Sequence, residues 1–550
     1  MDPEIIIALD IGSTYSGYAY QFSSDFNDNP RDIWMSDSWS GSNSTHKTST
    51  CLLLKCDTLE RIAIGEVAER KYLRFLDTGT ECSYHLFKNF KMTLYRKDFT
   101  TDETPENLKN QVEDQGGRHK PFTLVMSKYI EGLKEDCLER FERYDGQQKE
   151  RGIWKGQTTG AGSKPVIDGK RIRWVITVPA IWNDFAKHAM RESAVMVCGT
   201  VDITAVKVLE NGHLEQIMMA NGGPWGGQSV NDSFSQLVRD VFITKDGLSS
   251  LGSCKRIDLF EMELEFERQK VAIRGKKKDD EQLIKLRLPD EVWSVEKDRI
   301  LKSERHKYSK YFEITKNGLY FRPDIISEIL VNEPLKVILE HLQRILNKEK
   351  IRSIETIILV GGLAESHIVQ TKIKEALPDR HILVPSKPFV AVLNGAVLYG
   401  QKPDIFESRI SRFTYGIDTH IQFDPKKHPP EKKKEDNAGN IWCKDVFDIH
   451  VKRNQTVSLN EEQLPIVYEP FEGNQTSIVF DIYQTESLNP VYVTDEGCKK
   501  IGSLVVEMPD VTKGREKNAQ ITMIYGDTEL GVKGIDVTTG KEFKTTIVYD

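Results

Sequence analysis

The residues best suited to chemistry lie near the start of the sequence, where an apolar run ends in a carboxylate and a glycine. Residues 5–17 read Ile-Ile-Ile-Ala-Leu-Asp-Ile-Gly-Ser-Thr-Tyr-Ser-Gly. Gly12 allows close approach to the backbone, and successive N–H groups with the hydroxyls of Ser13 and Thr14 can hold phosphate oxygens. Asp10 at the strand end can hold Mg²⁺ through water, because hard cations prefer oxygen ligands. The pattern predicts a phosphate-binding hairpin, with an ordinary hairpin turn as the alternative.

A second glycine-containing turn lies much later in the chain. Residues 357–366 read Ile-Ile-Leu-Val-Gly-Gly-Leu-Ala-Glu-Ser, so an apolar strand again ends in glycine, at Gly361 and Gly362, before a helix. Such a turn can admit a planar base or a sugar against bare backbone, close to the N-terminus of the helix. A tight turn between a strand and a helix explains the same residues equally well.

The elements that must position these turns change in character along the chain. Up to residue 402, apolar strands such as 173–179 and 356–360 alternate with helical patterns such as 123–143 and 323–346. Strands that alternate with helices predict α/β layers. From Phe413 onward the chain shows β-rich runs separated by turn residues, which predict an antiparallel β-domain. We therefore expect two domains, residues 1–402 and 410–550.

Composition excludes several classes of protein. The 550 residues are 39% hydrophobic and 29% charged, which is enough for real cores and excludes a chain that is disordered overall. The net charge of −7 gives no electrostatic reason to expect nucleic acid or an anionic membrane surface as a partner. No window approaches twenty apolar residues, so we expect no membrane-spanning helix. Eight scattered cysteines and the lack of a signal-peptide pattern favour a reduced, cytoplasmic compartment.

Several further motifs give the chain a family resemblance. The two turns, in this order, resemble those of the actin-like ATPase superfamily. The narrower resemblance is to the heat shock 70 kDa proteins, specifically their divergent subfamily 12, and it covers nearly the whole chain. It rests on Trp-Val-Ile-Thr-Val-Pro-Ala-Ile-Trp at 174–182, Asn-Gly-Gly-Pro-Trp-Gly-Gly at 221–227, His-Pro-Pro-Glu-Lys at 428–432 and Trp-Cys-Lys-Asp-Val-Phe at 442–447.

The resemblance implies a fold and an activity. The fold would be α/β, a two-lobed actin-like (RNase H-like) ATPase that closes over ATP, followed by an antiparallel β-sandwich. Residues 451–456 and 536–541 are similar to pieces of that sandwich, which binds extended peptide in the better-known members. ATP or ADP and Mg²⁺ would be the cofactors. Extended peptides or protein clients would be the partners of a chaperone that acts in the stress response.

The resemblance also implies site residues, position by position. Glu267 and Lys270 match positions that contact adenosine, although an exposed i, i+3 surface pair explains them equally well. The catalytic lysine falls within residues 86–92, where we choose Lys91, with Lys88 as its rival and a solvated surface lysine as an equal alternative. The two nucleotide loops match at Asp10, Gly12, Ser13, Thr14 and Tyr15 and at Gly361, Gly362 and Ala364.

The second phosphate hairpin departs from the family pattern of a strand, an Asp, a run of glycines, a Thr and a second Asp. Residues 195–202 read Val-Met-Val-Cys-Gly-Thr-Val-Asp, so only Gly199, Thr200 and Asp202 match. The helix expected from Asn183 runs almost directly into this hairpin, whereas a parallel crossover needs a dozen or more residues. We interpret this as an internal deletion of several tens of residues, through an alternative transcript, an error in the gene model or a loss in this lineage.

The departure bears on catalysis, for which Asp10, Lys91 and Asp202 are the candidates. Phosphoryl transfer depends on positioning and electrostatic stabilisation, so the damaged hairpin predicts weak or absent ATP hydrolysis with residual nucleotide binding. The mostly polar segment 401–412 also lacks the leucine-rich character of the family's linker, which predicts poor coupling between the domains. The alternatives are a non-catalytic interaction scaffold that has lost nucleotide binding and, more weakly, a sugar kinase on the same fold.

Overall fold

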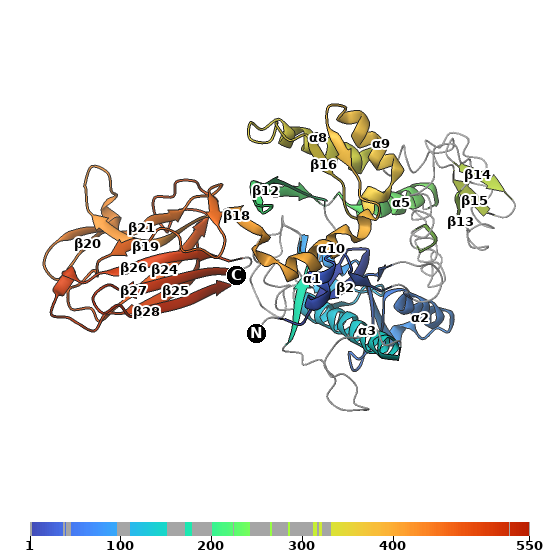
Figure 1. The fold of residues 1–550 in the computed structure, drawn as a ribbon, viewed down its shortest axis with the longest axis horizontal. Helices are drawn as coiled ribbons and strands as arrows, with labels where there is room; N and C mark the ends of the chain where they lie inside the picture. The colour runs from blue at the N-terminus through green and yellow to red at the C-terminus, as the bar shows by residue number, and fades with distance from the viewer. Residues whose placement is uncertain are drawn as a thin grey trace. The chain divides into compact units, whose positions relative to one another are not determined.

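The computed structural model describes most of the chain as two compact units (Figure 1). The first unit holds the described residues up to Ile203 and those of Gly222–Lys402. The second unit holds Thr204–Asn221 and Pro403–Asp550. The described residues are 3–36, 39, 46–95, 111–150, 171–178, 201–223, 225–242, 264–266, 284–286, 312–315, 318–321, 332–526 and 529–548.

The first unit is built on a five-stranded sheet that begins with the hairpin of β1 (Ile5–Ile11) and β2 (Tyr15–Phe22). Strand β10 (Ile172–Ile176) pairs in parallel with β1, and the short strands β3 (Trp34–Met35) and β4 (Thr48–Ser49) both pair with β2. Every residue of β1 is buried, as its continuous apolar sequence requires.

Successive residues of β2 face opposite sides of the sheet, and a different helix contacts each side. Ala8 and Ala19 are register partners and share a core with residues of α10 (Pro388–Gln401). The next residue along β2, Tyr18, points the other way and donates its phenol to Asp136 on α3 (Phe122–Glu150) over 2.6 Å. Two helices therefore hold β1 and β2, whose turn is the predicted phosphate loop. The helix α1 (Ser23–Asp28) follows β2 directly.

A three-stranded sheet, ordered β6-β5-β7, follows in the same unit. The strands are β5 (Cys51–Lys55), β6 (Arg61–Ile64) and β7 (Tyr84–Lys88), and α2 (Gly65–Asp77) packs on them through Ala68 and Tyr72. The 3-10 helix η2 (Phe90–Tyr95) comes directly after β7 and carries Lys91.

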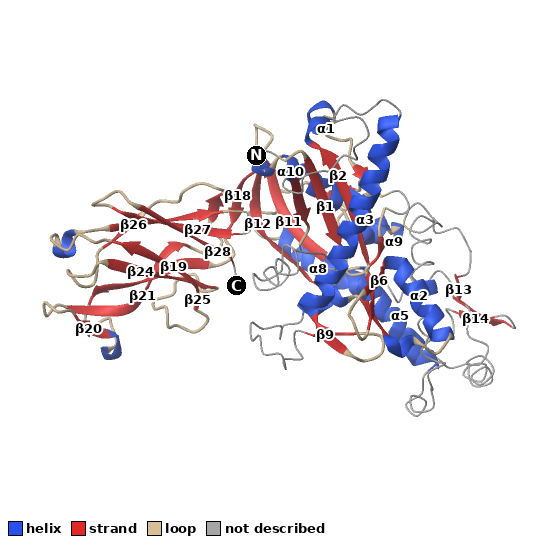
Figure 2. Cartoon of the chain, turned by 90° about the horizontal axis from the view of Figure 1, so that it is seen from below, coloured by secondary structure: helices blue, strands red, loops and turns tan. Residues whose placement is uncertain are grey.

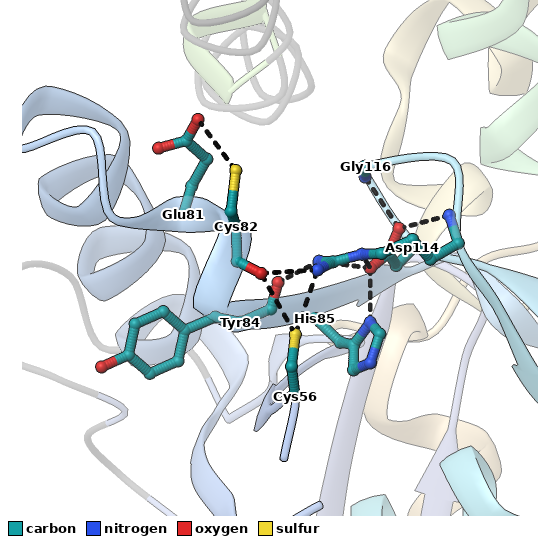
Figure 3. A network of polar contacts seen from close by, with 8 residues as sticks. Cys56, Glu81, Cys82, Tyr84, His85, Asp114 and Gly116 are labelled. Atoms are coloured by element: carbon teal, nitrogen blue, oxygen red, sulfur yellow. Dashed lines mark hydrogen bonds and ion pairs between the residues drawn. The ribbon is translucent and has the colours of Figure 1, made fainter.

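A buried polar network fixes β7 in place (Figure 3). The Asp114 carboxylate accepts hydrogen bonds from the backbone N–H groups of Gly116 and Arg118, each at 2.8 Å, and from His85 Nδ1 at 2.6 Å. Arg118 also donates its Nη1 to the carbonyl of Cys82 over 2.7 Å. The network ties the turn between β8 (Gln111–Glu113) and β9 (His119–Pro121) to β7, and so fixes the strand from which η2 begins.

One strand of the first unit differs from the sequence prediction. Residues 356–360 were expected to form a buried strand, yet Ile358 and Val360 are 59% and 46% exposed. Among the described residues, β16 (Thr356–Ile358) pairs only with β17 (His381–Leu383), so it does not lie inside a larger parallel sheet, whose strands are covered by helices on both faces. The remaining elements of this unit are α5 (Gly227–Phe242), β13 (Ile284–Leu286), β14 (Phe312–Thr315), β15 (Gly318–Phe321), α8 (Asn332–Leu346) and α9 (His367–Ala376).

The second unit contains two antiparallel sheets, as the β-rich runs predict. Their orders are β20-β21-β19-β24-β25 and β23-β26-β27-β28, and one hydrophobic core takes residues from both, including Ile482 and Ile521. Figure 2 shows strands and single helical turns throughout this described region. The strands are β19 (Thr414–Gln422), β20 (Lys433–Glu435), β21 (Ile441–Val451), β23 (Ile466–Tyr468), β24 (Ser477–Thr485), β25 (Lys499–Glu507), β26 (Ala519–Tyr525), β27 (Glu529–Asp536) and β28 (Glu542–Val548).

The polar segment 401–412 contains a strand that the sequence did not predict. Phe406–Ile410 forms β18, which pairs in parallel with β12 (Leu214–Gly223) and antiparallel with β22 (Thr456–Ser458). The three strands belong to one sheet, ordered β11-β12-β18-β22, in which β11 spans Val201–Val208. Strand β18 has polar side chains at three of its five positions, although Phe406 packs against the core of this unit, which explains why composition concealed the strand.

Two further observations concern expectations drawn from composition. The described cysteines, Cys51, Cys56, Cys82, Cys137, Cys443 and Cys498, are free thiols. No helix within the described residues has the length and apolar character that crossing a membrane requires.

Candidate functional site

The first hairpin forms the turn that the sequence predicts. Strands β1 and β2 pair up to Ile11 and Ser16, and the Gly12 N–H donates to the carbonyl of Tyr15 over 2.8 Å. Thr50 holds this turn from outside, because its N–H donates to the Thr14 carbonyl at 2.8 Å and its hydroxyl to the Gly12 carbonyl at 2.5 Å. The backbone of the turn is therefore fixed by hydrogen bonds at both of its ends.

Asp10 lies at the end of β1 and is 4% exposed. Thr177 donates its hydroxyl to Oδ1 of Asp10 over 2.7 Å, and the ammonium of Lys47 forms an ion pair with Oδ2. Burial alone would raise the pKa of Asp10. The charge and hydrogen bond of Lys47, the hydroxyl of Thr177 and the charge of Lys91 together lower the pKa below its usual value. The carboxylate is therefore ionised at neutral pH.

The structure distinguishes between the two candidate lysines. Lys91 is 1% exposed, and its charge acts on Asp10. The neighbouring Met92 accepts a hydrogen bond from the Ser13 hydroxyl at 3.3 Å, so η2 lies directly against the hairpin. Lys88 instead pairs with Glu69 at 3.1 Å. The geometry thus favours Lys91 over Lys88 as the lysine of this site.

The second turn lies in the same unit. Gly361 has a φ of +87°, a left-handed conformation that favours glycine, and its N–H donates to the Pro388 carbonyl over 2.7 Å. Ala364 is buried in the 3-10 helix η8 (Gly362–Glu365), and its carbonyl accepts from Gln370 at 2.8 Å. The ring of Phe389, next to Pro388, stacks on His46 with 6.1 Å between ring centroids. The start of α10 therefore contacts both the second turn and the segment that carries Lys47.

Other predicted site residues remain predictions. Asp202 lies on β11, where the structure describes the backbone but not this side chain. Gly199, Thr200, Glu267 and Lys270 lie outside the described residues, as does the stretch in which a deletion is expected.

The expected Mg²⁺ site at Asp10 stays a prediction that the residues present do not favour, because the ammonium of Lys47 pairs with Oδ2 and would repel a divalent cation held there. Both carboxylate oxygens are already engaged, one by a hydroxyl and the other by an ammonium. Across the described part of the chain, no group of three or more His, Cys, Asp or Glu side chains could hold a metal ion. No step of the chemistry can therefore be assigned to a metal held by Asp10.

Sequence reasoning missed the two partners of Asp10. Thr177 follows β10, which pairs with β1 in parallel at Leu9 and Ile176, so residue 177 comes level with Asp10. That register could have indicated the hydroxyl. Lys47 had a weaker signal in Gly17, because a glycine inside a strand marks a place where another chain segment approaches closely.

The observed fold agrees with the fold class that the sequence predicts. It combines an α/β unit, in which a glycine-containing hairpin ends beside a buried carboxylate, with an antiparallel β-domain, and this is the fold class expected of an actin-like ATPase with a β-sandwich. The particular likeness is to heat shock 70 kDa proteins 12A and 12B, and the predicted resemblance is confirmed over 99% of the chain. No family profile matches the chain.

The matches cover most of each relative. The chain is 25% identical to human heat shock 70 kDa protein 12B over 660 positions, covering 91% of that protein, and 26% identical to mouse 12A over 653 positions, again covering 91%. Both alignments are longer than the 550 residues of the chain, so they contain gaps in which this chain has no residue.

Similar solved structures include two proteins bound to AMPPNP. MreB5 of Spiroplasma citri bound to AMPPNP is 10% identical with a TM-score of 0.35, covering 74% of this chain and 96% of that one. A non-polymerising MamK mutant bound to AMPPNP is 10% identical with a TM-score of 0.33, covering 73% of this chain and 100% of that one.

Proposed function

We propose that this chain is an ATP- or ADP-binding protein of the heat shock 70 kDa type that hydrolyses ATP weakly or not at all. The observation that carries the proposal is the fixed hairpin at Gly12–Tyr15, with the ammonium groups of Lys47 and Lys91 beside it. Buried cations next to a turn with fixed backbone suit a phosphate chain. The likeness to heat shock 70 kDa proteins 12A and 12B over 99% of the chain supports the same ligand.

One feature of the sequence and one of the structure support weak hydrolysis. Residues 195–202 keep only Gly199, Thr200 and Asp202 of the family's second phosphate hairpin. The ion pair with Lys47 helps to lower the pKa of Asp10, which makes this carboxylate a weaker general base. The loss of a general base typically lowers a rate by about 10²–10⁴-fold.

The β-domain supports a chaperone-type role with extended peptides or protein clients in the cytoplasm. Strand β23 is a terminal strand of its sheet among the described residues, Val467 on it is 57% exposed, and Leu464, three residues earlier, is 89% exposed. Extended peptides can add to such an edge through main-chain hydrogen bonds. The free thiols of the described cysteines agree with a reducing compartment.

Thermal unfolding of the full chain with and without ATP or ADP tests the nucleotide proposal. A ligand at 100 times its Kd should stabilise the protein by about 2.7 kcal/mol. We expect Lys91→Met to abolish the shift and Lys88→Met, which breaks a buried pair elsewhere in the unit, to retain it. No shift with either nucleotide, with or without Mg²⁺, would instead support the non-catalytic scaffold.

Phosphate release measured on the same preparations tests the second half of the proposal. We expect turnover far below that of an intact heat shock 70 kDa relative measured in parallel. Equal turnover would show that the second hairpin works despite its sequence, and would leave nucleotide binding in place while refuting impaired hydrolysis.

A further inference from the structure

We propose that Lys47 is the built-in counter-cation of Asp10, so that the hairpin binds a free nucleoside polyphosphate without a divalent metal ion. The inference rests on the nucleotide binding proposed above and specifies the form of the ligand. A buried carboxylate beside a phosphate site must be neutralised, and in this chain an ammonium group from a distant segment does so.

The position of Lys47 follows from strand pairing. Strand β4 pairs with β2 so that Thr48 lies opposite Ser16 and Ser49 opposite Tyr15. Lys47 consequently comes next to Gly17, which is itself the register partner of Asp10. The chain thus places the lysine beside the position of β2 that lies across from the carboxylate.

Gly17 leaves the space that the lysine stem occupies. A Cβ atom at this position would lie 2.8 Å from Cγ of Lys47 and 2.7 Å from the His46 carbonyl oxygen, distances that real Cβ atoms essentially never show. The glycine therefore permits segment 46–47 to lie flat against β2, and this close approach points the ammonium at Asp10.

The segment around Lys47 is anchored on both sides. On one side, His46 Nδ1 lies 2.9 Å from the Ser36 carbonyl oxygen and the His46 ring stacks on Phe389. On the other side, Thr50 makes the two hydrogen bonds to the turn already described. The side chains of Lys47 and Asp10 are only 14% and 6% exposed. Lys47 and Asp10 therefore form a largely buried ion pair that the surrounding contacts hold in place, unlike a surface lysine in chance contact.

The charges then favour a metal-free polyphosphate. Asp10 contributes one negative charge, while Lys47 and Lys91 contribute two positive charges, so these three described side chains are positive overall without a metal ion. Ammonium groups are established phosphate binders that act as point charges. Without Lys47, the carboxylate would repel the phosphates unless a divalent cation intervened.

Titration of the purified full chain with ATP, in excess Mg²⁺ and in excess EDTA, tests the inference by calorimetry. We expect the two Kd values of the wild type to agree within about threefold. In Lys47→Met, we expect metal-free affinity to fall by about tenfold or more, while affinity with Mg²⁺ falls less, because the metal can replace the missing charge. The matched control Lys88→Met should keep the wild-type ratio.

A rescue variant keeps the test decisive even if Lys47→Met fails to fold with a lone buried carboxylate. The double variant Lys47→Met/Asp10→Asn removes both charges, and we expect its Kd values for ATP with and without Mg²⁺ to agree within about threefold, because no lone carboxylate is left for a metal ion to neutralise. Wild type that binds ATP only with Mg²⁺, or a double variant that has lost metal-free binding, would overturn the role of Lys47. Wild type that binds ATP under neither condition would refute the proposed function itself.

Discussion

At the scale of single residues, Gly17 carries no functional group, yet its missing side chain decides where the ammonium of Lys47 lies. The sequence pattern located Asp10 correctly at a strand end, and oxygen chemistry then suggested a metal ion. In the structure, Asp10 pairs with an ammonium from a position 37 residues away, after a stretch rich in Ser, Asn and Asp that has no periodic pattern. Local spacing could not predict this pair, because strand register brings the two residues together.

Asp418 on β19 gives a test of stability against pH. Burial, followed by the nearby charges of Asp445 and Asp481, raises the pKa of Asp418 to about 6. The native state therefore binds a proton more tightly than the unfolded chain, and stability should fall as pH rises from about 4 to 6. We expect Asp418→Asn to stabilise the second unit at pH 7 by about 1–3 kcal/mol and to flatten this dependence, as measured by urea unfolding.

The control for that experiment is Asp424, whose pKa is lowered, chiefly by a hydrogen bond from the Lys426 N–H. A lowered carboxyl pKa contributes stability that is present at neutral pH and lost in acid, which is the opposite sign. Asp424→Asn should therefore not stabilise the protein at pH 7. If Asp418→Asn were neutral or destabilising there, the environment inferred for Asp418 would be wrong.

At the scale of elements, α10 contains two glycines in opposite situations. A Cβ at Gly400 would lie 2.4 Å from Ile6 Cγ2 and 2.7 Å from Val175 Cγ2, whereas a Cβ at Gly395 would meet nothing within 4 Å. We expect Gly400→Ala to destabilise the first unit by about 1–3 kcal/mol through overpacking. Gly395→Ala should stabilise it by about 0.5–1 kcal/mol, because alanine favours the helix. Denaturant unfolding of both variants checks this, and equal effects would contradict close packing of α10 on β1 and β10.

The elements also show where sequence patterns succeed and fail. The continuous apolar run of β1 and the alternating runs after Phe413 predicted strands, and both are present. Strand β18 was missed because its side chains are mostly polar and only backbone pairing reveals it. The exposure of β16 was missed because apolar sequence reports what a strand could bury, whereas its neighbours decide what it does bury.

At the scale of the whole molecule, each unit has a hydrophobic core of its own. We expect calorimetry of the full chain to resolve two unfolding transitions, because multi-domain proteins depart from two-state behaviour. Nucleotide should raise only the transition of the first unit. Ile482→Ala, in the core of the second unit, should lower only the other, at a cost of about 2–5 kcal/mol. Transitions that move together under either change would show that the units unfold as one.

The Arg118 network has a practical consequence for anyone who labels this protein. The side chain of Cys82 is exposed and points toward Glu81, whereas the sulfur of Cys56 accepts a hydrogen bond from Arg118 Nη1 at 3.0 Å (Figure 3). Burial also raises the pKa of the Cys56 thiol, which lowers its share of reactive thiolate. Alkylating reagents should therefore modify Cys82 first. The slower modification of Cys56 would report how often Arg118 breaks its hydrogen bonds to Cys56 and to the Cys82 carbonyl beside β7, the strand that precedes Lys91.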